Sequence, residues 1–243
     1  NYTIKPKRDD NPLNGVTTAD IVRIQRHILG IENLISPYKL IAADVNNTNN
    51  ITASDISEIR KLVLGVIEKF AKNESWTFVP QKYAFPDKLN PYSAPRDILV
   101  NVLDPISYRE NFVAIKIGDV TNSARAHNIG SAIQRADGKL HFEIENGKTI
   151  AGELYKVDFK SSDFNNIIGY QFTLKFDQKN LSFESIEPGK LSVDNSNFGT
   201  NRTEQGILTT SWNNKTALTA TENETLFTVV FRALSNESIG KLL

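Results

Sequence analysis

Oxygen-bearing side chains occur twice along this chain with the same spacing. The segments DDNPLNGVTTAD (residues 9–20) and DVNNTNNITASD (residues 44–55) align position by position at an offset of 35 residues. Calcium takes about six to eight oxygen ligands, and a loop of this length supplies them from its positions 1, 3, 5, 7, 9 and 12. In the second segment these positions hold Asp44, Asn46, Thr48, Asn50 with its backbone carbonyl, Thr52 and Asp55. The sequence therefore predicts a calcium site in the second loop.

The first loop has a weaker set of ligands. Its predicted ligands are Asp9, Asn11, the carbonyl of Gly15, Thr17 and Asp20. Leu13 stands at position 5, where it offers no side-chain oxygen. Pro12 stands at position 4 and makes the backbone stiff there. Each loop has only two carboxylates, and ligand charge helps to set affinity. We therefore expect one or two calcium ions, bound at roughly tens of micromolar to millimolar concentration.

Position 6 of such a loop makes a sharp turn. Asn14 and Asn49 stand there, and asparagine enters the left-handed backbone region more readily than most residues. A simpler interpretation is that both segments are polar turns that cap helices, through Thr17 or Asp20 and through Thr52 or Ser54. The internal repeat favours calcium over this alternative. A third Asp–x–x–Asn pattern begins at Asp119 and lacks an acid at position 12, so it is the weakest candidate.

The repeat also predicts one amphipathic helix after each loop. Apolar residues recur at helical spacing over residues 18–29 and again over residues 54–64. Gly30 and Gly65 follow these segments, and glycine commonly follows the end of a helix. The connector contains Ser36–Pro37, from which we expect a turn. Two helices this short bury little surface, so a bound metal would help to stabilise them.

A calcium loop followed by a helix, repeated once, resembles the type I dockerin domain over residues 8–68. The acid at position 12 is Asp20 in one loop and Asp55 in the other, where a classical EF-hand has Glu. The resemblance implies a non-catalytic module with two calcium ions and a helical face that binds a cohesin domain. It also implies that loop positions 10 and 11 contact the partner, and these are Thr18, Ala19, Ala53 and Ser54.

The segments around this module have different compositions. Residues 1–7 are predicted to form a short strand, the end of a preceding domain or a lead-in. Residues 69–124 are rich in aromatic residues and proline and are predicted to pack on the module. Residues 111–124 are predicted to form a buried strand and a polar turn. The whole segment from SWTFVP to FVAIKIGDVTNSA, residues 75–124, resembles the extension found after dockerin-like repeats in secreted proteins of the Bacteroidetes. Polar residues 125–137 are predicted to be a linker.

From residue 138 the sequence changes to short alternating runs separated by turn residues, which is typical of an antiparallel β-sandwich. The runs lie at residues 139–150, 153–161, 167–186, 206–214 and 225–234. The runs IGYQFTLKFD, LSF and ETLFTVVF resemble core strands of the cohesin family, and part of this pattern is shared with jelly-roll carbohydrate-binding modules. A further strand is expected to begin at the chain's end, so that the sandwich would be incomplete there or completed by another strand.

The predicted fold class is multidomain α+β: a small two-helix dockerin-like calcium module with its extension, then an antiparallel β-sandwich that is cohesin-like or jelly-roll-like. The 28 basic and 28 acidic residues balance without a dense basic stripe, so nucleic-acid binding has no support. No apolar stretch approaches the length of about 18 residues that spans a membrane. Without cysteine, disulfides and thiolate metal sites are excluded. Since no methionine is present, even at position 1, we expect a processed chain or a piece of a longer protein.

No enzyme is predicted. The three histidines, His27, His127 and His141, are isolated, and the chain has no zinc motif, nucleophile elbow or phosphate loop. The patterns favour a secreted calcium-binding assembly or adhesion segment of a larger bacterial surface protein. Its partner would be a protein: a cohesin-like domain in the same chain, in another chain or in a second copy, and copies docking head to tail would form filaments.

Two other interpretations remain open at this stage. The chain resembles, in part, a carbohydrate-binding accessory module of a polysaccharide-degrading enzyme, with candidate contacts at Trp76, Tyr83, Tyr92 and Trp212. Alternatively, the calcium loops are stiffeners in a multidomain adhesin, and binding takes place elsewhere.

Overall fold

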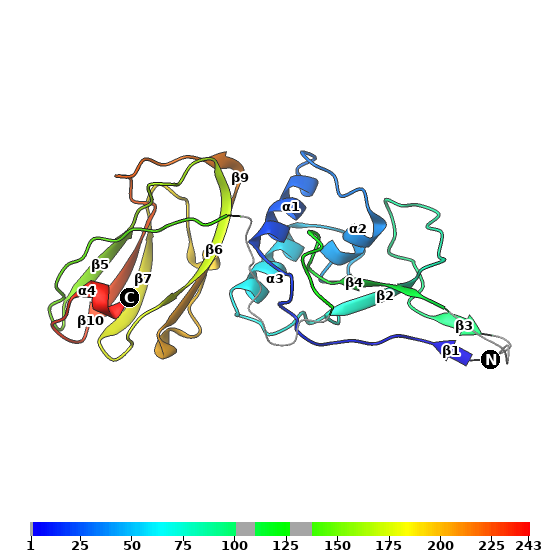
Figure 1. Cartoon of the computed structure of the whole chain (residues 1–243), viewed down its shortest axis with the longest axis horizontal. Coiled ribbons are helices and arrows are strands. Elements are labelled where there is room, and N and C mark those ends of the chain that lie inside the picture. Colours follow the sequence, from blue (N-terminus) through cyan, green and yellow to red (C-terminus); the bar gives the residue numbers. More distant parts are fainter. Residues whose placement is uncertain (1, 101–109, 127–137) are drawn as a thin grey trace. The chain divides into compact units, whose positions relative to one another are not determined.

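The computed structural model describes residues 2–100, 110–126 and 138–243. The chain divides into two compact units, residues 1–63 with 67–135 and residues 64–66 with 136–243 (Figure 1). Most of the predicted linker at 125–137 lies outside the described residues.

The first unit combines helices with two small antiparallel sheets. Its elements are β1 (Tyr2–Ile4), α1 (Thr18–Ile28), α2 (Pro37–Ala43), α3 (Ala53–Val63), β2 (Trp76–Pro80), β3 (Ile98–Val100) and β4 (Phe112–Lys116). Strand β2 pairs with β4, and β1 pairs with β3. The strand predicted within residues 1–7 is confirmed, and its partner β3 belongs to the same chain.

Helices α1 and α3 lie where the repeat predicts them, each within one residue at either end. Helix α1 begins after Thr17, whose backbone N–H donates to Asp20 Oδ2 at 2.8 Å, as in a capping box. After the helix, Gly30 adopts a left-handed φ of 68°. The buried residues of α1 and α3, such as Ile24 and Ile59, share one core with β4.

Helix α2 is not in the prediction. Pro37 was expected to make a turn, but it is the first residue of a helix, a position that tolerates proline because its N–H would be unsatisfied there. The following residues Leu40, Ile41, Ala42 and Ala43 are all buried. A Ser–Pro pair ahead of an apolar run was therefore a helix start signal.

The second unit is a sandwich of two three-stranded antiparallel sheets. Its strands are β5 (Leu154–Phe159), β6 (Ile167–Lys175), β7 (Leu181–Pro188), β8 (Phe198–Gly199), β9 (Ile207–Leu218) and β10 (Phe227–Ala233). One sheet has the order β5-β10-β7, and the other has the order β6-β9-β8 (Figure 1). Short 3-10 helices η1 (Asn195–Asn197) and η2 (Thr203–Gln205) precede β8 and β9. The antiparallel sandwich predicted from the alternating runs is thus confirmed.

An aromatic core joins the two sheets. Phe159 and Phe227 come from one sheet and stack with centroids 4.7 Å apart, while Tyr170 and Trp212 from the other sheet stack at 5.5 Å. Phe142 contacts both groups at its ring edges. Because strand alternation directs every second side chain inward, these rings fill one continuous interior.

Two predicted strands of the second unit are wrong. Residues 139–150 form only isolated bridges, Glu143 with Lys160 and Lys148 with Ser238, because only these single residues of the segment pair with a neighbouring chain segment. The strand expected at the chain's end is instead a short helix, α4 (Ile239–Leu242). Its Ile239 and Leu242 are buried in the sandwich core.

Candidate calcium loops and docking surfaces

The second loop folds around Asp44 at position 1. Asp44 Oδ1 accepts the backbone N–H of Thr48 at 2.9 Å, and Oδ2 accepts that of Asn49 at 2.8 Å. Asn47 and Asn49 have left-handed φ values of 56° and 62°. The turn predicted at Asn49 is confirmed, and it directs the loop's own N–H groups at the Asp44 carboxylate.

Asp55 at position 12 closes the same loop. Its side chain is buried and accepts the N–H of Asn46 at 3.2 Å and that of Thr52 at 2.9 Å. The Thr52 hydroxyl lies 3.2 Å from the same carboxylate. The structure therefore brings positions 1, 3, 9 and 12 of the predicted site into one compact loop.

One oxygen in this loop has no hydrogen-bond partner. Asn46 Oδ1, at ligand position 3, is buried and accepts no hydrogen bond from the described residues. A buried acceptor without a partner costs roughly 1–3 kcal/mol, and native structures rarely leave one unexplained. An amide oxygen is a typical calcium ligand. The second loop thus fits calcium, which Asp44, Asn46, Thr48, the carbonyl of Asn50, Thr52 and Asp55 would hold.

The electrostatics of the second loop also favour a cation. Burial raises the pKa of Asp55, and the negative charge of Asp44 raises it further. Burial and then the charges of Asp44 and Asp55 raise the pKa of the Tyr92 hydroxyl to about 12. These shifts identify negative charge that a calcium ion would stabilise.

The first loop directs its carboxylate at position 1 toward other segments. Asp9 Oδ1 accepts the backbone N–H and the hydroxyl of Ser75, at 2.9 and 3.0 Å, and Oδ2 lies 3.4 Å from Lys69 Nζ. The hydrogen bond from the Ser75 N–H is the largest of the effects that lower the pKa of Asp9. Asp9 therefore does not repeat the arrangement of Asp44.

Asp20, at position 12 of the first loop, is completely buried. Its Oδ1 accepts the backbone N–H groups of Val120 at 2.9 Å and Thr121 at 3.0 Å. Burial, and then the nearby negative charge of Asp119, raise the pKa of Asp20 to about 6. This carboxylate anchors the turn after β4 to the start of α1.

Asp119, the weakest calcium candidate, stabilises the turn in which it lies. It accepts the N–H groups of Thr121 at 3.0 Å, Ser123 at 3.2 Å and Ala124 at 2.7 Å. These bonds hold the polar turn that was predicted after the buried strand.

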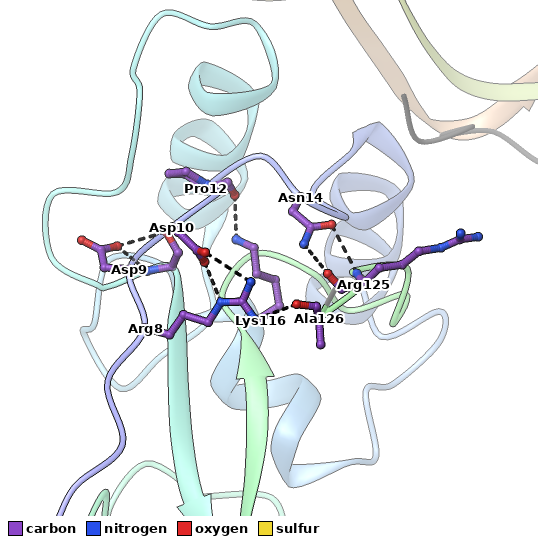
Figure 2. Close-up of polar contacts among 9 residues, drawn as sticks. Arg8, Asp9, Asp10, Pro12, Asn14, Lys116, Arg125 and Ala126 are labelled. Carbon is purple, nitrogen blue, oxygen red and sulfur yellow. Dashed lines mark hydrogen bonds and ion pairs between the residues drawn. The ribbon is translucent and has the colours of Figure 1, made fainter. Parts of the chain in front are cut away.

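The segment that follows this turn is held against the first loop. Asn14 donates its side-chain N–H to the carbonyl of Arg125 at 2.9 Å and accepts the Arg125 N–H at 3.3 Å, while Arg8 donates to the carbonyl of Ala126 at 2.9 Å (Figure 2). The carbonyl of Gly15, a predicted ligand, accepts the Ser123 hydroxyl at 2.8 Å. One residue of the predicted linker, Arg125, therefore binds the first loop, and the next, Ala126, binds Arg8 just before that loop.

The turn predicted at Asn14 is wrong. The left-handed residues of the first loop are Asn11, with φ 46°, and Gly15, with φ 76°. The backbone of this loop thus turns at positions 3 and 7 rather than at position 6. Despite the sequence repeat, the two loops do not share one conformation.

The predicted partner-contact positions differ in accessibility. Ala19, Ala53 and Ser54 are exposed, but Thr18 is buried, with 3% of its surface accessible. Thr18 is therefore corrected from a contact residue to an interior one, since it stands at the start of α1 beside the buried Asp20. The pair beside the second loop keeps both side chains at the surface.

The aromatic candidates for sugar stacking are not a surface platform. Trp212 is 2% exposed and Trp76 is 6% exposed. Trp212 stacks on Tyr170 within the sandwich core, and Arg8 covers the Trp76 ring at 5.0 Å. Tyr83 and Tyr92 are half-buried. The prediction that sugars stack on Trp76 or Trp212 is therefore wrong, because both rings are buried in the interior.

The described histidines are in separate surroundings. His27 Nδ1 accepts the backbone N–H of Leu34 at 3.3 Å, and His141 contacts the exposed Asp163 at 2.8 Å. His127 lies outside the described residues. In the described ranges, no group of three or more His, Cys, Asp or Glu side chains gathers to hold a metal, and no helix is long and apolar enough to cross a membrane.

The two sheets of the second unit have different outer faces. On β5-β10-β7, charged residues form cross-strand pairs, with Lys156 Nζ 2.8 Å from Glu187 and Arg232 Nε 2.7 Å from Glu184. On β6-β9, the outward positions that pair across the strands are Gln171 with Ser211 and Thr173 with Thr209. All four side chains are uncharged, but Ser211 and Thr209 are buried, and the Thr209 hydroxyl donates to the carbonyl of Leu64 at 2.6 Å. The accessible part of this face therefore lies at Gln171 and Thr173.

The sequence of the second unit matches a known protein family. Residues 151–242 match the family model of the cohesin domain. The matched residues all lie in the second unit, and we call residues 138–243 of that unit the cohesin-like unit from here on. The cohesin resemblance predicted from the strand patterns is confirmed for this part of the chain.

Two solved structures are similar to this chain. One is a mutant type II cohesin–X–dockerin complex from Acetivibrio cellulolyticus, with 20% sequence identity, a TM-score of 0.31, and coverage of 41% of this chain and 74% of that chain. The other is a type II cohesin domain from the cellulosome of the same organism, with 20% identity, a TM-score of 0.29, and coverage of 42% and 72%. A comparison with curated proteins gave no match.

Proposed function

We propose that this chain is a non-catalytic, calcium-binding assembly segment of a larger secreted bacterial protein. The single observation that carries this proposal is the match of residues 151–242 to the cohesin domain, a protein-binding module. The first unit supplies the second part: two loop–helix repeats with the order of a type I dockerin, the partner class of cohesins. Calcium loops with two carboxylates suit the high calcium concentration outside cells.

Calcium in the second loop has a structural role. When bound, the ion supplies positive charge between Asp44 and Asp55, which lie at the two ends of the loop and are both buried. It would also satisfy the buried oxygen of Asn46. Because Asp55 lies in the first turn of α3, the ion fixes the start of that helix, where Ala53 and Ser54 are exposed for a partner.

The docking surface we assign to the cohesin-like unit is the accessible part of the β6-β9 outer face, at Gln171 and Thr173. A partner that covers a sheet face must desolvate it, and short uncharged hydroxyl and amide groups cost less to desolvate than charges. The outer face of β5-β10-β7 has satisfied ion pairs instead, such as Lys156 with Glu187. An occupant would have to break these pairs.

The occupant we assign is the first unit of a second copy. A cohesin-like face and a dockerin-like helical face on one chain are complementary, so each copy offers both sides of the contact. A heterologous contact of this kind does not close on itself unless the rotation forms a ring, and it therefore produces open chains of copies.

Sedimentation velocity of the full chain tests this proposal. We expect the weight-average mass to rise with protein concentration in millimolar calcium and to remain monomeric in chelator. Thr173→Glu places a charge on the exposed centre of β6-β9 and should abolish the rise. Ser182→Glu makes the same change at an exposed strand position opposite Arg232 on the other sheet and should leave it intact.

Three outcomes would count against it. A monomer at every concentration in calcium removes self-assembly and leaves the loops as stiffeners. Equal loss of association in both variants removes the assignment to the β6-β9 face. Association that is unchanged by chelator removes the role of calcium.

A further inference from the structure

A lysine ammonium lies at the first loop. Lys116 is the last residue of β4, and only 4% of its surface is accessible. Its Nζ donates to the carbonyl of Pro12 at 2.6 Å (Figure 2). The same Nζ lies 3.4 Å from the carbonyl of Ile117. Pro12 is position 4 of the twelve-residue loop, so the positive charge reaches the loop from a strand more than a hundred residues away in sequence.

Four carboxylates contribute negative charge at this ammonium. Burial lowers the pKa of Lys116 to about 8, while the negative charges of Asp119, Asp10, Asp20 and Asp9 act in the opposite direction. The lysine therefore remains largely protonated at neutral pH. A buried charge is tolerated only where hydrogen bonds and opposite charges compensate its desolvation, and the first loop supplies both.

Several first-loop oxygens that calcium would need are bound to donors from outside the loop. Asp9 accepts from Ser75, the Gly15 carbonyl accepts from Ser123, and Asp20 accepts from Val120 and Thr121. Three of the five ligands predicted from the sequence thus bind groups outside the loop. Position 5 is Leu13, which has no oxygen to add.

The corresponding oxygens of the second loop have different hydrogen-bond partners. Its carboxylate at position 1 binds the loop's own backbone, and its position-3 amide oxygen is buried without a hydrogen bond. The carbonyls of Asp44 and Val45 accept from the neutral amide of Asn73, at 2.9 and 3.1 Å. These contacts therefore bring no positive charge to the second loop that could replace a metal ion.

We propose that the Lys116 ammonium takes the place of a calcium ion at the first loop, so that the folded chain binds one calcium ion, in its second loop. The count of one rests on the calcium site proposed above for the second loop. The role of Lys116 is independent of that site, since it concerns the first loop alone. The first half of the repeat is then held by an internal cation at any calcium concentration.

Isothermal titration of the full chain with calcium chloride tests the proposal. We expect one ion for the unmodified chain and none after Asp44→Asn. Lys116→Met removes the ammonium and should add a second, weaker ion, which Asp20→Asn in the same chain should remove. Lys82→Met is the matched control, because it removes an exposed lysine of the same unit, and it should still bind one ion.

Circular dichroism in chelator establishes that each variant is folded, and Lys116→Gln serves if Lys116→Met is not. Two ions on the unmodified chain, or calcium retained after Asp44→Asn, would overturn the proposal. A folded lysine variant without an additional ion would also overturn it, because the lysine would then not be what excludes calcium. If the unmodified chain binds no ion, the site in the second loop fails, and an ion gained by Lys116→Met would still support the lysine's role.

Discussion

Thr121 donates its backbone N–H to Asp20 Oδ1 at 3.0 Å, although 101 residues separate the two in sequence. This bond joins the first helix to the turn after β4. Together with the bond from Val120 at 2.9 Å, it makes a predicted metal ligand into a structural acceptor. The same carboxylate also receives the Thr17 N–H at 2.8 Å, so the first loop is fixed from both ends.

The raised pKa of Asp20 predicts a pH dependence of stability. The pKa is about 6 in the folded chain against the ordinary 3.8, so the folded state binds a proton more tightly between these values. The stabilisation from this proton is fully present below pH 3.8 and is lost as the pH rises through 6. Urea unfolding in chelator should show this contribution between pH 4 and 6, on the order of 2 kcal/mol.

Asp20→Asn provides the control for this effect. The variant lacks the titrating group, so its unfolding free energy should rise more steeply with pH than that of the unmodified chain across the same range. Parallel pH profiles for the two proteins would contradict the assignment. The ordinary carboxylates cancel in this comparison, since both chains retain them.

Gly15→Ala should destabilise the first unit by several kcal/mol. The residue has a φ of 76°, and an added Cβ would lie 2.5 Å from the backbone nitrogen of Ala124. Backbone atoms cannot yield without moving the turn that is held against the first loop. Gly30→Ala is the control: its φ is 68°, but nothing lies within 4 Å of the added Cβ. It should cost only about 1 kcal/mol of backbone strain. Equal midpoints of urea unfolding would contradict this difference.

Asn46→Ala should have opposite effects in chelator and in calcium. Without calcium, the substitution removes a buried oxygen that has no partner, so stability should stay the same or rise. With calcium, it removes a ligand, and the affinity should fall about tenfold or more, since a contact to a charge contributes roughly 1.5–3 kcal/mol. Thermal unfolding with and without calcium measures both effects, and a loss of stability in chelator would contradict the first.

Trp212→Ala should unfold or strongly destabilise the cohesin-like unit. The ring is 2% exposed and stacks on Tyr170, so its removal leaves a cavity and costs about 3–5 kcal/mol. Leu154→Ala, at a strand position that is 55% exposed, should change stability by less than about 0.5 kcal/mol. Urea unfolding followed by near-ultraviolet circular dichroism compares the two. A stable Trp212→Ala chain would mean that the ring is accessible after all.

Local sequence pattern predicted the regular elements well. Helices α1 and α3 follow from the spacing of isoleucines and the glycines after them, and the sandwich strands follow from alternation with turn residues between them. The errors lie where an apolar run has no periodic signal. Residues 139–150 and 239–242 have suitable side chains for a strand, but hydrogen-bonding partners decide whether a strand forms, and these come from distant segments.

The candidate site divides in the same way. For the second loop, the sequence by itself determined how the predicted ligands are arranged. The backbone hydrogen bonds to the Asp44 and Asp55 carboxylates come from residues of the same twelve-residue loop. For the first loop, the tertiary structure decided. Lys116 supplies a cation to this loop, and the turn at 119–124 supplies hydrogen-bond donors to the loop's oxygens. Both lie about a hundred residues further along the chain. A repeat records what two loops have in common; burial against different neighbours determines what each of them can bind.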